Sequence, residues 1–327
     1  MAPAKPVDVA LLVLLGVLWG VSFMAISAGL RSVEPVFFAA VRYDVAAVLM
    51  LGVALVVSPR ALFPKNGRQW VAVLVAGVLN VTGYHAFLYY GQQFTTSGIA
   101  ALVIGLNPIV AMVIARALLP GERVGRWGLL GLLLGLLGLV ALVGLRPGDL
   151  FGAQGLGELI VFGAVISWGL GSVVVKKTAH GIPVIPFTAM QMVVGAILLH
   201  GVSLALEGTS PQAEWSPASL ASLMYLAVIA SGVGFLLYFT LLERIGPVRS
   251  TLVSYIAPIA AALSGFLVLG EPFEWRFVVA FLLIVSGFRL VIREAPAPRR
   301  SPDLSSATGV VSRTGLNRRR GGGRERP

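Results

Sequence analysis

The sequence predicts an all-α polytopic membrane protein with ten transmembrane helices, arranged as two inverted repeats of five helices each. The 327 residues are 57% hydrophobic and only 12% charged. Apolar runs long enough to cross a bilayer core of about 30 Å recur along the chain, separated by short polar segments. A constant shift of 149 residues aligns Trp19 with Trp168 and Tyr89 with Tyr238, which indicates that the two halves share one plan.

The predicted spans divide the chain into two repeats and their flanking segments. The ten spans are residues 8–29, 36–57, 70–91, 97–118, 127–145, 155–175, 182–206, 218–241, 249–269 and 275–293. We expect a cytoplasmic N-terminus at 1–8, the first repeat at 9–145, a linker at 146–154, the second repeat at 155–293 and an Arg-rich tail at 294–327. No room remains for a folded soluble domain, so the function is expected to lie among the helices.

The distribution of basic residues predicts the orientation. Lysine and arginine are concentrated in the loops after the second, fourth, sixth and eighth spans, whereas the alternate loops hold few. Basic loops face the cytoplasm, so both termini are predicted to be cytoplasmic. Because each half has an odd number of helices, the second half enters the membrane from the opposite side, which makes the repeat inverted. Inverted repeats allow two similar halves to exchange conformations across a membrane.

Spans one and six carry matched tryptophans near their centres. Interfacial tryptophans would lie at span ends, whereas Trp19 and Trp168 offer an indole N–H and a flat ring at mid-depth. Ser22 follows one turn after Trp19. We therefore treat these three residues as substrate-binding candidates. A structural role is the alternative, because Gly20 and Gly169 beside the rings allow close helix approach.

Spans two and seven differ chemically at equivalent positions. Arg42 lies about two turns inside span two and could bind an acidic group, and the repeat shift replaces it with Gln191. Asp44 is the deepest carboxylate of any span, which makes it the candidate for proton coupling. A spacing of two residues turns Arg42 and Asp44 to nearly opposite helix faces, so they are not expected to pair.

Spans three and eight each carry a polar stripe. Thr82, His85, Tyr89 and Gln92 follow one another at steps of three, four and three, which places them on one helix face. Tyr238 repeats the tyrosine in span eight. The stripes either line a water-accessible cavity, which would place His85, Tyr89 and Tyr238 in a binding site, or join neighbouring helices by hydrogen bonds.

Spans four and nine contain matched prolines, Pro108 and Pro258. A proline removes a backbone hydrogen bond, and freed backbone at membrane depth is tolerated only against protein or a watery cavity. Interrupted helices at corresponding positions of two repeats are the best sequence indication of a transporter site. The prolines are thus candidates for helix breaks and gating, and Asn107 and Tyr255 for substrate binding. Simple packing kinks are the alternative.

Several chemistries are disfavoured by the residues present. The chain has no cysteine, no HExxH pattern and no P-loop, and no second deep aspartate to partner Asp44. We therefore expect neither metal nor cofactor. Eight of the 25 basic residues lie in the tail at 294–327, which should stay disordered near anionic lipid, so the net charge of +11 does not predict nucleic-acid binding. The expected partners are the lipid bilayer and a small-molecule substrate, and a homodimer stays open.

The order and pairing of these motifs resemble a known family. The segment LLPGER at 118–123 is echoed by LVLGEP at 267–272, each a short way after its proline. With the tryptophan–glycine pair of each half and Arg42, they resemble the EamA-type repeat of the drug/metabolite transporter superfamily over 9–145 and 155–293. The resemblance implies a carrier of the bacterial inner membrane, with a cavity formed by helices one to four and six to nine. It also implies substrates such as amino acids or other small metabolites, commonly exported.

The leading functional hypothesis is a secondary transporter that works by alternating access around a midplane site. An intramembrane enzyme is the first alternative, although such enzymes need paired aspartates, a Ser/His dyad or a metal cluster that this sequence does not suggest. A membrane scaffold without transport activity is the second. We therefore expect a protein that is not an enzyme.

Overall fold

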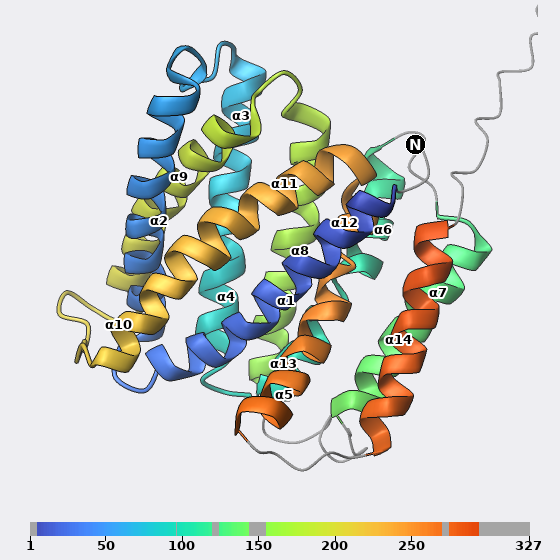
Figure 1. The fold of residues 1–327 in the computed structure, drawn as a ribbon. Helices are drawn as coiled ribbons and strands as arrows, with labels where there is room; N and C mark the ends of the chain where they lie inside the picture. Colours follow the sequence, from blue (N-terminus) through green and yellow to red (C-terminus); the bar gives the residue numbers. More distant parts are fainter. Residues whose placement is uncertain (1–4, 96, 120–123, 144–154, 270–274, 294–327) are drawn as a thin grey trace, which may run out of the picture. The chain divides into compact units, whose positions relative to one another are not determined.

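The computed structural model describes residues 5–95, 97–119, 124–143, 155–269 and 275–293. All the named elements in these ranges are helices (Figure 1). The expected linker at 146–154 and the expected tail at 294–327 lie outside the described residues. The same holds for the first four residues of the expected N-terminal segment.

In the described residues, the first half of the chain supplies nine helical elements. They are α1 (Pro6–Gly29), α2 (Pro35–Val57), the 3₁₀-helix η1 (Pro59–Ala61), α3 (Gly67–Val75), the π-helix η2 (Ala76–Gly83), α4 (Tyr84–Gly91), α5 (Ser97–Ile104), α6 (Asn107–Leu118) and α7 (Arg126–Val143).

The second half supplies eight. They are α8 (Gly155–Thr178), α9 (Val184–Leu206), α10 (Pro217–Met224), the π-helix η4 (Tyr225–Val233), α11 (Gly234–Ile245), α12 (Pro247–Ser250), α13 (Val253–Leu269) and α14 (Trp275–Arg293). Seven helical stretches in the described residues are long and apolar enough to cross a membrane, and two further apolar stretches are shorter.

Helix ends follow local sequence signals. Proline begins α1, α2 and α10, where its missing N–H costs no intrahelical bond. Asn66 caps α3, because its side chain accepts a hydrogen bond from the backbone N–H of Gln69 at 3.0 Å. Gly246 ends α11 with a φ of 82°, a backbone conformation that favours glycine.

The two halves share element boundaries as well as residues. A shift of 149 carries both ends of α1 onto those of α8, and both ends of α2 onto those of α9. The start of π-helix η2 is likewise carried onto the start of η4. The third span of each half is therefore an α-helix interrupted by a π-helical segment. Such segments are frequent at functional sites. Hydrophobic periodicity did not predict these segments.

The fourth and ninth spans are interrupted, but not at the prolines where the breaks were expected. Residues 105–106 separate α5 from α6, and Pro108 lies in the first turn of α6 instead of kinking a continuous helix. Proline fits a first turn because the N–H groups there have no intrahelical hydrogen-bond partner, so its missing N–H costs nothing. In the second half the break lies at 251–252, between α12 and α13, while Pro258 is inside α13.

Equivalent helices of the two halves contact one another in antiparallel pairs. In Figure 1, α7 lies beside α14 and α2 beside α9. The carboxylate of Glu207, just after α9, accepts the backbone N–H groups of Val36 and Phe37 at the start of α2, at 2.6 and 2.8 Å. The end of α9 therefore meets the beginning of α2. In the centre, α1 packs against α11 and α13, and α4 packs against α8.

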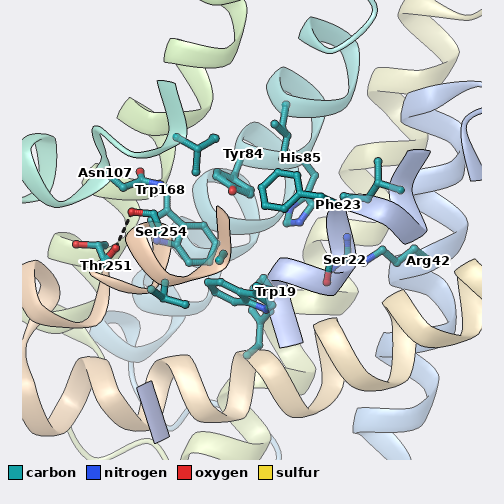
Figure 2. Close-up of a pocket in the computed structure, with 16 residues that line it drawn as sticks. Trp19, Ser22, Phe23, Arg42, Tyr84, His85, Asn107, Trp168, Thr251 and Ser254 are labelled. Carbon is teal, nitrogen blue, oxygen red and sulfur yellow. Dashed lines mark hydrogen bonds between the residues drawn. The ribbon is translucent and has the colours of Figure 1, made fainter. Parts of the chain in front are cut away.

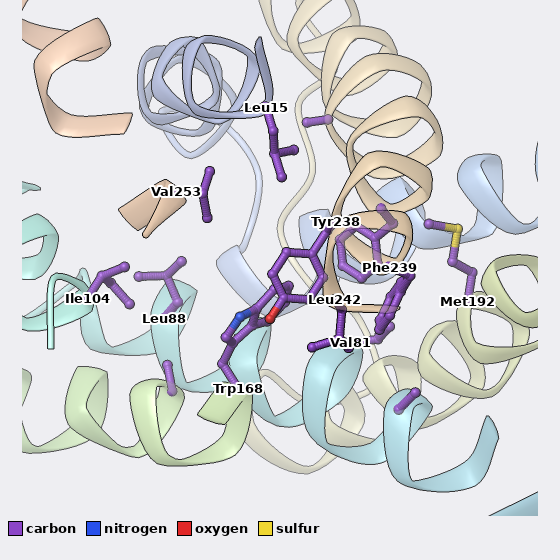
Figure 3. Close-up of a cluster of buried hydrophobic side chains, with 14 of the residues drawn as sticks. Leu15, Val81, Leu88, Ile104, Trp168, Met192, Tyr238, Phe239, Leu242 and Val253 are labelled. Carbon is purple, nitrogen blue, oxygen red and sulfur yellow. The ribbon is translucent and has the colours of Figure 1, made fainter. Parts of the chain in front are cut away.

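Aromatic and aliphatic side chains from both halves form the buried core (Figure 3). Trp168, Tyr238 and Phe239 meet there from α8 and α11, and Leu15 of α1 and Val81 of η2 are fully buried in the same cluster. The core therefore joins the two halves, and the site described below lies against it.

Candidate functional site

A cavity of ≈650 Å³, including its open part, lies between the two halves (Figure 2). Helices α1, α2, α4, α5, α6, α8, α11 and α13 and the break between α12 and α13 contribute side chains to it. The lining consists of Trp19, Ser22, Phe23, Ile26, Arg42, Tyr84, His85, Leu88, Ile104, Asn107, Trp168, Phe235, Thr251, Val253, Ser254 and Ala257.

Aromatic rings form the middle of the cavity wall. The equivalent residues Trp19 and Trp168 meet edge to face, with ring centroids 5.5 Å apart and an interplanar angle of 81°. The ring centroids of Tyr84 and Trp168 are 4.7 Å apart, and those of Phe235 and Trp19 are 6.1 Å apart. The Trp19 indole Nε1 donates to the Ala230 carbonyl of π-helix η4 at 3.0 Å, which fixes the ring against the other half.

Arg42 occupies one end of the cavity, beside Ser22 (Figure 2). Its side chain is buried, at 3% exposure. Its Nε donates to the hydroxyl of Ser231 at 2.9 Å and its Nη1 donates to the hydroxyl of Tyr89 at 2.8 Å. The guanidinium also lies 5.2 Å from the ring centre of Tyr43. All these partners are neutral.

Both ring nitrogens of His85 have partners. Nδ1 lies 2.8 Å from the Val81 carbonyl and Nε2 lies 3.0 Å from the hydroxyl of Tyr43. Because a carbonyl oxygen can only accept, Nδ1 carries the hydrogen, and Nε2 of the neutral ring accepts from Tyr43. His85 therefore presents its ring, and no free nitrogen, to the cavity.

The opposite end of the cavity is formed by the two helix breaks (Figure 2). Asn107 is the first residue of α6, and Thr251 and Ser254 flank the break before α13. The Ser254 hydroxyl donates to the Thr251 carbonyl at 2.8 Å. The buried side-chain oxygen Oδ1 of Asn107 has no hydrogen-bond partner. Both helix interruptions therefore adjoin the cavity.

Six of the ten predicted binding residues line the cavity: Trp19, Ser22, Arg42, His85, Asn107 and Trp168. Two others contact residues of the lining from outside the cavity. Tyr89 holds the Arg42 guanidinium, and Tyr238 stacks on Trp19 at 5.6 Å and lies 2.7 Å from the Ser172 hydroxyl. Both tyrosines are completely buried.

The remaining predicted residues lie elsewhere. Gln191 is completely buried, and neither its side-chain oxygen Oε1 nor its side-chain nitrogen Nε2 has a hydrogen-bond partner. The Tyr255 hydroxyl donates to the Leu132 carbonyl of α7 at 2.8 Å, which fastens α13 to α7. Asp44 pairs with His200 of α9, with Oδ2 and Nε2 2.7 Å apart and both side chains almost half exposed. These three residues are not part of the cavity lining.

Sequence reasoning missed several members of the site. Tyr84 and Phe235 line the cavity, and Tyr43 holds His85. Asn80 of η2 donates to the Trp168 carbonyl at 3.1 Å. A signal was available for Asn80, since a buried amide in an apolar span must find a partner. Tyr43 and Tyr84 are adjacent to Arg42 and His85 in sequence and carried no separate signal.

The described residues hold no group of three or more histidine and acidic side chains that could bind a metal ion. The polar groups of the lining are four hydroxyls, the Asn107 amide, the Arg42 guanidinium, the His85 ring and the indoles of Trp19 and Trp168.

A helical membrane protein with an internal cavity between two similar halves defines the class of this chain. The chain belongs to the EamA-like transporter family, whose model matches residues 8–144 and 155–293. Its relatives are transporters of the drug/metabolite transporter superfamily.

Full-length relatives support the same class. The chain is 27% identical over 270 residues to the uncharacterized transporter YoaV of Bacillus subtilis, covering 83% of this chain and 91% of the relative. It is 24% identical to the protein PagO of Salmonella typhimurium, covering 90% and 97% of the two chains. A protein of known crystal structure has the same fold, with a TM-score of 0.73 at 21% identity, over 88% of this chain and 96% of that one.

Proposed function

We propose that this protein is a secondary transporter that moves a small metabolite, an amino acid or a related compound, by alternating access around the central cavity, most naturally as an exporter of the bacterial inner membrane. The observation that carries the proposal is the position of the cavity, whose wall contains Trp19 and Trp168, the equivalent residues of the two halves. A site between similar halves can be exposed to either side in turn.

Ten membrane passages in two inverted repeats suit the observed contacts best. Equivalent helices α2 and α9 pair end to beginning, as do α7 and α14, where Gly131 adjoins Gly287 and Gly138 adjoins Ile284. Antiparallel pairing of equivalent helices is expected when one repeat is turned over relative to the other. The three spans beyond the seven long helices are then the broken fourth and ninth spans and α7.

We place both termini in the cytoplasm, as the basic loops suggest. The ends of α1, α8 and α11 on that side are joined by charged contacts: Arg244 pairs with the buried Asp8 at 3.0 Å, and the Lys176 ammonium donates to the Glu243 carbonyl. The cavity extends along the second half of α1, away from these contacts. This arrangement fits a conformation that is closed on the inner side.

Transport itself is the first test. Purified protein in liposomes is expected to move at least one member of a panel of amino acids and related metabolites faster than protein-free liposomes. Trp19→Ala should abolish the protein-dependent flux, because it removes the ring that closes the wall of the cavity. An absence of flux for the whole panel in both directions, with and without a proton gradient, would count against a transporter and favour the scaffold alternative.

Proton coupling is assigned to Asp44, with His200 as its partner. Asp44→Asn is expected to leave facilitated exchange within about twofold of the native rate and to abolish accumulation driven by a pH gradient, because the amide cannot take up a proton. His200→Gln provides the matched test of the partner. Gradient-driven accumulation that persists in Asp44→Asn would assign coupling to another group, whereas its absence in the native protein would make the protein a facilitator.

An enzyme within the membrane is the competing class. An enzyme would need a nucleophile and a base within reach of each other in the cavity. In the described residues His85 has both nitrogens engaged by Tyr43 and Val81, and Asp44 lies away from the cavity. The geometry therefore favours a binding and transport role.

A further inference from the structure

We propose that the transported solute is a monocarboxylate, with its carboxylate on Arg42, an apolar body between the cavity's aromatic rings and a hydrogen-bond donor at its far end on Asn107. This assignment rests on the proposed function, since it names the substrate class of the same cavity. It goes beyond that function because it fixes the charge, polarity and orientation of the solute.

The first observation is a buried cation without a counter-ion. Arg42 is 3% exposed, and no described carboxylate lies within ion-pair distance of it. The described ion pairs engage other residues, namely Asp8 with Arg244 and Asp44 with His200. A buried charge paired only with neutral hydroxyls is costly. An anionic ligand would remove that cost.

The guanidinium has hydrogen-bonding capacity to spare. Of its five N–H groups, one at Nε is taken by Ser231 and one at Nη1 by Tyr89. Those two bonds orient the planar group while three N–H groups stay available beside the cavity. A planar carboxylate matches such a fork with two parallel hydrogen bonds.

The charge of the lining limits the ligand to one negative charge. Arg42 is the only lysine or arginine in the described lining, and both ring nitrogens of His85 are already engaged by Tyr43 and Val81. A phosphate monoester would bring up to two negative charges against a single arginine. The single cation therefore favours a carboxylate over a phosphate.

The second, independent observation is the unpartnered oxygen of Asn107. Oδ1 is buried and without a hydrogen-bond partner, in a residue that is 4% exposed and lines the cavity. A buried acceptor left unpaired costs about 1–3 kcal/mol, so a donor from the ligand is its natural complement.

The two polar ends are separated by aromatic rings. Figure 2 shows Arg42 and Ser22 at one end, Asn107 at the other, and Trp19, Tyr84 and His85 between them. Aromatic side chains thus lie between the group that would bind a carboxylate and the oxygen that would accept from a donor. The solute therefore carries its donor, such as a hydroxyl, amine or ring N–H, at the end of an apolar body.

A matched set of three ligands tests the assignment by calorimetry on the detergent-solubilised full chain. The set is 3-(4-hydroxyphenyl)propionate, its primary amide, which removes the charge, and its methyl ether, which removes the donor. Native protein is expected to bind the acid at least about tenfold more tightly than the amide, since hydrogen bonds to charged groups exceed neutral ones. It should also prefer the hydroxyl to the ether by about threefold or more.

The variants locate each preference. Arg42→Gln should reduce the acid-to-amide ratio to within about twofold, and Asn107→Leu should remove the preference for hydroxyl over ether while keeping the charge preference. Arg116→Gln, at an exposed position of α6, is the matched control and should bind like the native protein. Such cycles isolate the coupling between one residue and one ligand group.

Clear outcomes would overturn the assignment. Equal binding of acid and amide by native protein would do so even if Arg42→Gln failed to fold. An acid-to-amide ratio that is unchanged in Arg42→Gln, tighter binding of the corresponding phosphate monoester, or no binding of the acid at all would do the same. Arg42-dependent binding with no flux in liposomes would instead contradict the proposed transport while leaving the ligand assignment intact.

Discussion

Replacing Gly287 with alanine is expected to destabilise the protein by about 3 kcal/mol, at the upper end of the usual cost of overpacking. A Cβ at Gly287 would lie 2.7 Å from the backbone nitrogen of Gly135 and would also meet the Gly131 carbonyl oxygen of α7. Backbone atoms cannot rotate away as a side chain can. The α7–α14 pair would have to separate, and in a membrane close backbone packing is a main source of helix association.

Gly52→Ala is the matched control for Gly287→Ala. No atom outside its own helix lies within 4 Å of a Cβ built at Gly52, so the same change should be neutral or stabilising by up to about 1 kcal/mol through helix propensity. The free energy of unfolding of both variants in the same detergent, measured by denaturant titration, checks the difference. Equal stability of the two would mean that α7 and α14 are further apart than the structure has them.

The helices themselves could be predicted from the sequence because their signals are local. Apolar runs gave the number of residues per span, and the repeat shift carried α1 and α2 onto α8 and α9. The observed bounds of α2 and α9 differ from the predicted 36–57 and 182–206 by at most two residues. Their starts coincide with a proline or follow one, a signal that is readable without a structure.

Backbone irregularities were harder to predict. The π segments at 76–83 and 225–233 leave no mark on hydrophobic periodicity, because one extra residue per turn changes the register of an apolar helix without changing its composition. The sequence predicted helix breaks at the prolines, whereas the observed breaks lie at 105–106 and 251–252. Pro108 fits the first turn of a helix, and Pro258 is accommodated inside one.

Pairings across the two halves were the least predictable part of the site. Arg42 and Ser231 are 189 residues apart, and Asp44 and His200 are 156 apart. Residue type alone marked Arg42 and Asp44 as costly in a membrane, but the three-dimensional fold decides which one meets the cavity. The sequence therefore identified Arg42 and Asp44 as candidates. The packing of α2 against α9 and η4 places Arg42 at the cavity and Asp44 away from it.

Trp168→Ala is expected to cost about 3 kcal/mol of stability and to abolish ligand binding and transport. Trp168 is 3% exposed, and its ring lies within 6 Å of the rings of Trp19, Tyr84, Tyr238 and Phe235. Since lipid is as apolar as the protein interior, the cost comes from lost packing contacts and the resulting void rather than from transfer out of water.

Trp275→Ala separates this packing cost from any general effect of losing a tryptophan in a membrane protein. Trp275 begins α14 and is 78% exposed, so the same substitution should change stability by less than about 1 kcal/mol and leave flux at the native rate. Trp168→Phe should recover most of the lost stability, because a phenyl ring fills much of the void. Recovery of flux in Trp168→Phe would show that ring packing suffices at this position, whereas a stable variant without flux would show that the indole itself contacts the solute. Native flux in Trp168→Ala would contradict the placement of the solute against the aromatic wall, since that wall would then be dispensable.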